Sequence, residues 1–222
     1  LGAARLFGAR PGEADDEMEE EELLVYLDQG AEAGAVAPLE RDFVEAVFEL
    51  DDLTIERVTV GGAPAAFSLL DEVEPFGKPL RVEVGAAGAH EVAIHYATSP
   101  ESSAIQWLEP ALTAGKVRPY VFTQCQAIHA RALLPCADTP SAKFTYEATV
   151  AVPAWATAVM SAVGTGAKVA GAKRKEGGAE GDRTFGFEQK CAIPSYLLAL
   201  AVGELEARSV GPRSQVWSEP SM

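Results

Sequence analysis

Basic residues are scarce in this chain of 222 residues, in which 18 Lys and Arg stand against 33 Asp and Glu and the formal net charge is −15. Nucleic-acid binding depends on Lys and Arg contacts to phosphates. Adhesion to an anionic membrane surface likewise needs clusters of basic side chains. The charge balance therefore predicts that neither a nucleic acid nor a membrane is a partner.

Long hydrophobic runs are lacking as well. The longest candidate, residues 196–203, has the length of a strand, whereas a membrane-spanning helix needs about 18 or more apolar residues. The N-terminus is acidic and does not show the basic and then apolar order of a secretory signal. Because the chain starts at Leu1 instead of Met, we expect it to be a processed product, an excised piece or an incomplete gene model.

Cysteine is limited to Cys125, Cys136 and Cys191. An odd number of widely spaced cysteines is more typical of free thiols in a reducing compartment than of a disulfide framework. The sequence therefore predicts a cytoplasmic protein. No Cys-x-x-Cys pair is present, which argues against a zinc knuckle.

Catalytic motifs are also missing. No His-Glu-x-x-His zinc motif, no Gly-x-Ser-x-Gly elbow and no Gly-x-x-x-x-Gly-Lys phosphate loop occurs. His90 and His95 come near a zinc motif, but they lie in an alternating segment, in which positions five apart face opposite sides of a strand. We therefore expect no metal, no cofactor and no catalytic residue in this chain itself.

Short segments of β-branched, aromatic and alternating residues are present instead, separated by Pro and Gly. They predict an all-β fold, a multi-stranded β-sandwich or saddle. We expect the acidic residues 1–22 to be mobile, residues 23–220 to form one β domain, and residues 164–182 to form a mobile hairpin loop. The expected strands are Leu23–Leu27, Phe43–Leu50, Leu53–Val60, Leu80–Val84, Glu91–Thr98, Tyr120–Thr123, Lys143–Val152, Ala158–Val163, Thr184–Lys190, Tyr196–Val202 and Glu204–Arg208.

Two neutral amides, Gln124 and Gln126, stand between apolar residues just after one of these segments. If the strand alternation continues, both amides share one face, and Thr123, Cys125 and Ala127 share the other. Two readings remain open from spacing alone. The amides either form a polar strand face in solvent, or they form a ligand edge for a peptide-like or carboxylate-bearing substrate.

Polar residues continue beyond this pair. His129 is either a core or edge histidine or a residue that lines a pocket beside Gln126. Arg131 and Asp138 flank the bend at Pro135, and we expect them to form a local ion pair with a structural role. Trp107 precedes Pro110, and we expect its ring to be packed.

These residues resemble a known family. The motifs that carry the resemblance are Gln124-Cys125-Gln126-Ala127-Ile128-His129, Arg131, Leu134-Pro135-Cys136, Asp138-Thr139-Pro140-Ser141, Gln106-Trp107-Leu108, Thr113-Ala114-Gly115-Lys116, Ile193-Pro194-Ser195-Tyr196-Leu197 and Val216-Trp217-Ser218-Glu219. With these motifs the chain resembles the N-terminal domain of the zinc aminopeptidases of the leukotriene-A(4) hydrolase and aminopeptidase B group. The similarity extends over residues 91–220, with a weaker match at 43–57. Cys125 and His129 fit the hydrolase branch better.

The resemblance implies a domain that covers one side of the active-site cleft of a cytoplasmic zinc aminopeptidase. It implies a peptide-binding role for Gln124, Cys125, Gln126, Ala127 and His129. Zinc and the catalytic groups would belong to a C-terminal catalytic domain of the same polypeptide, so that this chain is inactive alone. Whether the complete enzyme also hydrolyses a lipid epoxide stays open. The alternative is a non-catalytic β module that binds peptides or a partner protein.

Overall fold

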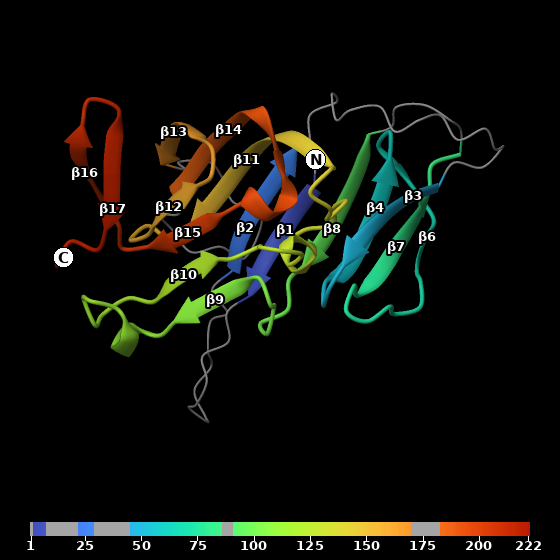
Figure 1. Ribbon diagram of the computed structural model, residues 1–222, viewed down its shortest axis with the longest axis horizontal. Coiled ribbons are helices and arrows are strands. Elements are labelled where there is room, and N and C mark those ends of the chain that lie inside the picture. The colour runs from blue at the N-terminus through green and yellow to red at the C-terminus, as the bar shows by residue number, and fades with distance from the viewer. Residues whose placement is uncertain (1, 8–21, 29–44, 86–90, 170–182) are drawn as a thin grey trace.

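The computed structural model describes residues 2–7, 22–28, 45–85, 91–169 and 183–222 (Figure 1). Its regular structure is almost entirely β, which confirms the predicted all-β class. Helical structure in the described ranges is limited to single 3-10 turns, and none of these is long enough to cross a membrane. The 3-10 turns are η1 (Pro110–Leu112), η2 (Ala130–Ala132) and η3 (Ser195–Leu197).

The largest sheet has eight strands in the order β13-β14-β11-β2-β1-β8-β4-β5. Neighbouring strands are antiparallel except for the parallel pair β1 and β8. Side chains of β11 alternate between buried and more exposed positions, which is the pattern of a strand with one face on the core. The strands are β13 (Val163–Val169), β14 (Arg183–Pro194), β11 (Lys143–Val152), β2 (Glu22–Asp28), β1 (Gly2–Phe7), β8 (Val92–Ala97), β4 (Thr54–Val60) and β5 (Ala63–Pro64).

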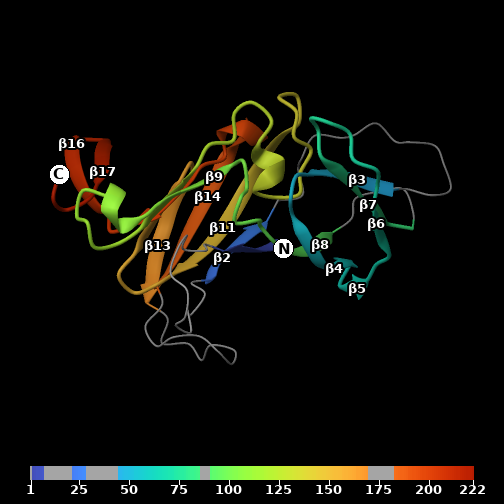
Figure 2. The same cartoon turned by 90° about the horizontal axis from the view of Figure 1, so that it is seen from below.

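A four-stranded sheet in the order β12-β15-β10-β9 lies over one face of the larger sheet (Figures 1 and 2). Its strand β10 leads directly into residues 124–129, which contain Gln124 and Gln126 and are called the glutamine segment below. This sheet therefore fixes where the glutamine segment starts. The strands are β12 (Thr157–Met160), β15 (Leu200–Gly203), β10 (Tyr120–Thr123) and β9 (Ile105–Leu108).

Two smaller sheets lie at opposite ends of the molecule (Figure 1). At one end, β3 (Glu45–Leu50), β7 (Lys78–Glu83) and β6 (Phe67–Leu69) form a three-stranded sheet. At the other end, β16 (Glu206–Gly211) and β17 (Ser214–Ser218) form an antiparallel hairpin. The candidate site lies between these ends.

One hydrophobic core joins the eight-stranded, the four-stranded and the three-stranded sheets. Val150 of β11, Val121 of β10 and Leu80 of β7 are buried in the same cluster. Leu133 and Leu134, which follow η2, belong to this cluster too. The chain after β10 is therefore tied into the core although it contains no strand.

Several strand predictions are confirmed. The strand predicted at Lys143–Val152 is β11 with the same bounds, because its alternation is strong. The predicted strands at 53–60 and 91–98 are β4 and β8. Trp107 is packed against the core, as expected.

Other predictions were wrong in part. Residues 164–169, which were expected within a mobile loop, belong to β13 (Val163–Val169) and pair with β14, while residues 170–182 lie outside the described ranges. The strand expected from Tyr196 begins only at Leu200, because Ser195–Leu197 forms a 3-10 turn after Pro194.

The acidic N-terminal segment 1–22 lies largely outside the described residues. Its part at Gly2–Phe7 forms β1, which pairs with β2 and β8 and which the sequence did not mark as a strand.

Candidate functional site

The glutamine segment is a turn at the end of β10. The strand ends at Thr123, where Thr123 Oγ1 accepts a hydrogen bond from Leu200 N at 2.9 Å. Gln124 N still donates to Ala104 O at 2.8 Å, and beyond that bond the chain leaves the sheet. Residues 126–129 then form a turn that runs into η2, and the peptide bond between Gln126 and Ala127 is cis.

The two glutamines have different roles in this turn. Gln124 Oε1 accepts a hydrogen bond from Gln126 N at 2.8 Å, so the Gln124 amide holds the turn from within. The Gln126 side chain is exposed, and no partner for its amide occurs among the described residues. It therefore retains N–H donors and a carbonyl acceptor for a ligand.

The expected alternation of faces holds through Gln126 and then fails. Gln124 and Gln126 are exposed and Cys125 is 1% exposed, as a continued strand would require. Ala127 is exposed instead of buried, because the chain has already turned away from the sheet. The predicted strand Tyr120–Thr123 is confirmed as β10, and only the alternation that was expected to continue to Ala127 is wrong.

Cys125 packs in the hydrophobic core, so any contact it makes with a ligand would be through its backbone. The pKa of the Cys125 thiol is raised to about 12, mainly by burial and also by the nearby Asp138 carboxylate, while a hydrogen bond with Thr123 acts to lower the pKa. The thiol therefore stays protonated near neutral pH and is a poor nucleophile and a poor metal ligand.

His129 is half-buried, and its ring is held by a short polar relay. Its Nδ1 lies 3.0 Å from Ser103 Oγ, and Ser103 Oγ donates to Asp51 Oδ2 at 3.2 Å. Because the serine hydrogen points to Asp51, Oγ accepts the Nδ1–H of His129. In the neutral ring this tautomer leaves Nε2 as an acceptor.

A buried ion pair lies beneath the turn, between the two residues that the sequence predicted to pair. Arg131 Nε is 3.1 Å from Asp138 Oδ2, and the side chains of Arg131 and Asp138 are 3% and 0% exposed. The backbone N of Arg131 donates to the same carboxylate oxygen at 3.2 Å, and Arg131 Nη2 donates to Asp138 O at 3.2 Å. The predicted local ion pair is confirmed.

Residues distant in the sequence complete this cluster. Ser195 Oγ donates to Asp138 Oδ1 at 2.5 Å. Glu49 Oε2 lies 3.2 Å from Arg131 Nη2 and accepts from Asp138 N at 2.6 Å. The polar groups of the pair thus have partners on β3 and at the start of η3.

The loop before β7 supplies another partner. Arg131 Nη1 donates to Phe76 O at 2.7 Å. Gly77, which follows, has φ of 78°, and a Cβ there would lie 2.0 Å from Leu50 O. Only glycine allows this approach, which brings Phe76 O against the arginine.

Sequence reasoning missed Glu49, Ser103 and Ser195. Glu49 lies 89 positions from Asp138, and Ser195 lies 57 positions from it. No local pattern connects residues at such separations. Only the order of the sheets brings them together.

A zinc ion does not fit the residues that the structure describes. No group of three or more His, Cys, Asp and Glu side chains in these ranges has a geometry suited to a metal. His95 Nε2 lies 2.7 Å from Arg57 Nη2, and His129 Nδ1 is engaged by Ser103. His90 lies outside the described ranges. No chemical step through a metal is therefore assigned to this chain.

Residues 39–197 match the Peptidase M1 N-terminal domain. The chain belongs to this family, and the resemblance noted from its motifs is confirmed.

Relatives of known name support the same class. Leukotriene A-4 hydrolase of Xenopus laevis is 41% identical over 191 residues, which cover 84% of this chain and 30% of the relative. Leucine aminopeptidase 2 of Phaeosphaeria nodorum is 40% identical over 181 residues, which cover 80% of this chain and 29% of the relative. This chain thus spans about 30% of the length of these relatives.

Solved structures share the fold. Native yeast LTA4 hydrolase superimposes with a TM-score of 0.69 and 27% identity, over 99% of this chain and 31% of the yeast chain. An M1 zinc metallopeptidase from Deinococcus radiodurans superimposes with a TM-score of 0.62 and 22% identity, over 97% of this chain and 45% of that one. The second likeness concerns the fold alone.

Proposed function

We propose that this chain is the substrate-cleft domain of a cytoplasmic zinc aminopeptidase, with the turn at Gln124–His129 as one edge of the cleft. The observation that carries the proposal is the exposed Gln126 amide, which has no partner among the described residues. The turn that carries this amide is held by the hydrogen bond of Gln126 N with Gln124 Oε1, and the buried ion pair of Arg131 and Asp138 follows it in the chain. The names of the relatives support a peptide as substrate. The free cysteines support a reducing compartment.

Neutral amides suit a peptide substrate. A glutamine side chain can donate to a peptide carbonyl and accept from a peptide N–H. It does so without repelling or trapping the charged amino end of the substrate. In this proposal Gln126 makes the contact, Gln124 holds the turn, and His129 Nε2 lies at its other end as a further acceptor.

The catalytic groups are proposed to come from a further domain of the same polypeptide. The described part of this chain has no residues that fit zinc, and we expect the chain alone to cleave no peptide. When bound in such a domain, zinc activates water and polarises a carbonyl. This chain would contribute substrate orientation.

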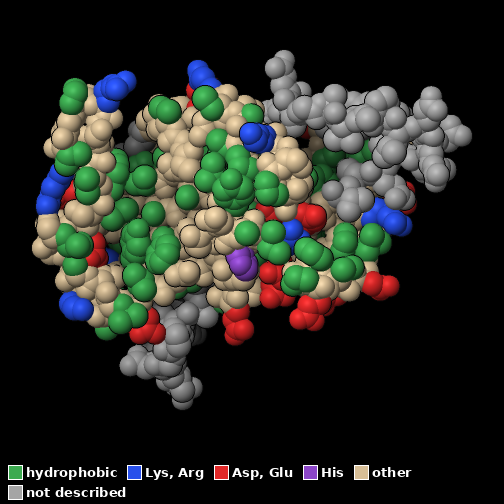
Figure 3. Space-filling view, viewed as in Figure 1, with side chains coloured by type: hydrophobic (Ala, Val, Ile, Leu, Met, Phe, Trp, Pro, Cys, Tyr) green, Lys and Arg blue, Asp and Glu red, His purple; other side chains and the backbone are tan. Residues whose placement is uncertain are grey.

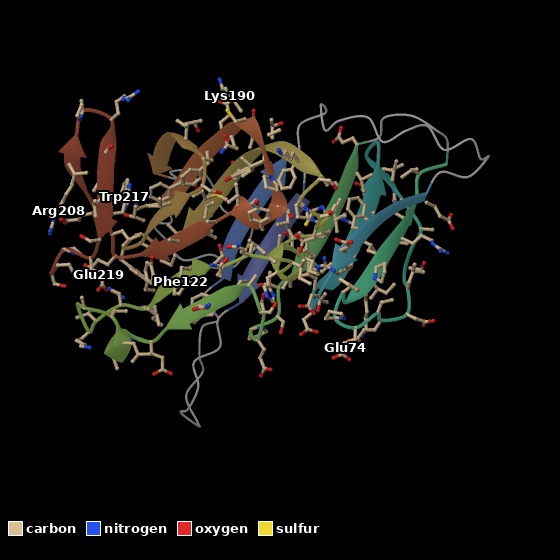
Figure 4. All side chains as sticks on the ribbon, in the orientation of Figure 1. Glu74, Phe122, Lys190, Arg208, Trp217 and Glu219 are labelled. Carbon is tan, nitrogen blue, oxygen red and sulfur yellow. The ribbon has the colours of Figure 1, made fainter. Side chains whose placement is uncertain are left out.

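The C-terminal hairpin supports a partner domain. Apolar side chains gather at this end of the molecule (Figure 3), where Trp217 and Arg208 of the hairpin are labelled in Figure 4. Val210 is 65% exposed and Trp217 is 42% exposed. Exposed apolar patches of this kind mark interaction sites. We propose that the catalytic domain covers this hairpin.

The experiment is Gln126→Leu in a polypeptide that joins this chain to its catalytic zinc domain. The substitution keeps most of the volume and removes the amide donors and acceptor. We expect kcat/KM for short peptides to fall roughly 10-fold, since about 1.4 kcal/mol of lost transition-state binding is tenfold in rate. Zinc content, measured by metal analysis, should not change.

The control is Ser68→Ala, a polar-to-apolar change at an exposed residue of β6, at the opposite end of the molecule from the hairpin (Figure 1). It should leave kcat/KM within about twofold. If Gln126→Leu behaves like the control while the protein stays folded, the turn is not a substrate edge. If Gln126→Leu also removes zinc, its role is structural.

A further inference from the structure

We propose that the buried pair of Arg131 and Asp138 positions the turn at Gln124–His129, which is called the glutamine turn here. In this view Asp138 touches no substrate and acts on the reaction by fixing the backbone that carries Gln126 and His129. The inference rests on the proposed function, since it assigns the turn a substrate to meet.

The contacts of the pair are directed at backbone atoms of one segment. The Asp138 carboxylate accepts from Arg131 N, and the Arg131 guanidinium donates to Asp138 O. Glu49 Oε2 accepts from Asp138 N. Arg131 O accepts from Asp51 N at 3.1 Å. The charged groups thus bind the backbone at both ends of the bend between Arg131 and Asp138.

That segment is also held by core packing and by hydrogen bonds from Tyr96 and Ser102, but it has little regular backbone pairing. Between the end of β10 and the start of β11 the chain forms no strand, and its only ladder contact is the isolated bridge of Glu49 with Cys136. An irregular connection longer than about 12–15 residues is uncommon in a compact domain unless it is functional. We infer that the ionic cluster holds the backbone of this connection in place, as hydrogen bonds between neighbouring strands hold a strand in a sheet.

A continuous path of contacts joins the pair to the candidate site. Arg131 O holds Asp51 N, Asp51 Oδ2 accepts from Ser103, and Ser103 Oγ holds His129 Nδ1. A second connection follows the backbone, since His129 N donates to Cys125 O at 3.0 Å and Ala132 N donates to His129 O at 3.0 Å. Through these hydrogen bonds, both ends of the turn are connected to the cluster around Arg131 and Asp138.

A role in stability alone does not account for this arrangement. Removing two charges from water offsets much of their attraction, so apolar residues of similar volume often stabilise a fold equally well. A fully hydrogen-bonded polar cluster adds a unique geometry. We infer that the geometry fixed by this pair is the backbone conformation of the glutamine turn.

The test is Asp138→Asn, alone and combined with Gln126→Leu, in a polypeptide that joins this chain to its catalytic domain. Asn keeps the shape and removes the charge that holds Arg131. We expect Asp138→Asn to lower kcat/KM for short peptides roughly 10- to 100-fold, the effect of a misplaced contact group. The double variant should be no slower than the slower single variant, because both changes remove the same contact.

The outcomes separate the two proposals. If Gln126→Leu lowers kcat/KM and the double variant lowers it by the product of the two single effects, Asp138 acts independently of the turn and the inference is wrong. If Asp138→Asn matches Glu188→Gln, a control that breaks the exposed ion pair of Glu188 with Lys190, the inference is also wrong. If Gln126→Leu itself has no effect, the proposed function fails first.

A milder variant keeps the test valid if Asp138→Asn does not fold. Ser195→Ala removes only the hydroxyl that donates to Asp138 Oδ1. In the isolated chain, the amide resonances of Gln126 and His129 in a two-dimensional NMR spectrum should shift, while those of β16 and β17 stay in place. Unshifted Gln126 and His129 resonances, or shifts spread evenly over the chain, would overturn the positioning role.

Discussion

The segment from Gln124 to Asp138 and the hairpin β16–β17 are opposites in regularity and in burial. The first has no strand, yet its Cys125, Arg131 and Asp138 side chains are buried. The second is a regular antiparallel ladder, yet nearly all its residues are exposed, Val210 and Trp217 among them. Backbone regularity therefore does not tell which part of this molecule is fixed.

The difference lies in what holds each region. Buried hydrogen bonds fix the irregular segment, both within it and with Glu49 of β3 and Ser195 of η3. The hairpin has its own ladder, but an isolated two-stranded hairpin is only marginally stable in water. Its end is tied to the body where Glu219 accepts a hydrogen bond from Ala114 N (Figure 4 labels Glu219). We infer that the first region is complete and that the second waits for a partner domain.

The largest effect should come from Arg131→Ala. This change leaves the Asp138 carboxylate buried without its cation, and removal of one partner of a buried pair costs about 3–5 kcal/mol. Urea unfolding of the isolated chain measures the loss. Arg208→Ala in β16 is the matched control, since Arg208 binds the carbonyl of Pro220 at the exposed end. It should cost about 0.5 kcal/mol or less. Equal losses in the two variants would erase the contrast between the regions.

A smaller effect should appear at alkaline pH. Burial raises the pKa of the Cys125 thiol to about 12 and holds the pKa of Cys136 well above its usual range. In the unfolded chain both thiols ionise near pH 8.5–9. The unfolded state then binds fewer protons than the folded state, so stability is full below about pH 8 and falls above about pH 9. The slope is at most about 1.4 kcal/mol per pH unit for each thiol.

Urea midpoints at about pH 8 and pH 10 check this. Cys125→Ala should make the decline less steep. The hairpin contains no cysteine or tyrosine, so Gln215→Leu should leave the decline unchanged. A stability that is constant or rises over this range would contradict the burial of the two thiols.

Sequence reasoning succeeded where the signal is local. β11 is predicted to the residue because its alternation directly reflects one buried face. The ion pair of Arg131 and Asp138 was also within reach, since seven positions and one bend separate the two residues.

Sequence reasoning failed where contacts with other strands or with distant residues determine the local structure. Residues 164–169 were predicted as part of a loop because residues 164–182 are rich in Gly, Ala, Lys and Glu, and pairing with β14 makes them part of β13. β17 has exposed residues on both faces and so lacks the alternation of a half-buried strand. The alternation expected beyond β10 fails at Ala127, where the chain has turned away from the sheet.

The smallest effect should come from Trp217→Ser in the isolated chain. The indole is already 42% exposed, so the free energy of unfolding should change by about 0.5 kcal/mol or less. Phe144→Ser, at a buried aromatic residue of β11, should cost at least about 3–5 kcal/mol by comparison. In a polypeptide that includes the catalytic domain, Trp217→Ser should instead cost about 1–2 kcal/mol of domain association, since aromatic residues dominate such contacts. Urea unfolding of both forms decides the point. A loss above about 1 kcal/mol in the isolated chain would mean that the hairpin is already packed, because surface changes rarely reach that size.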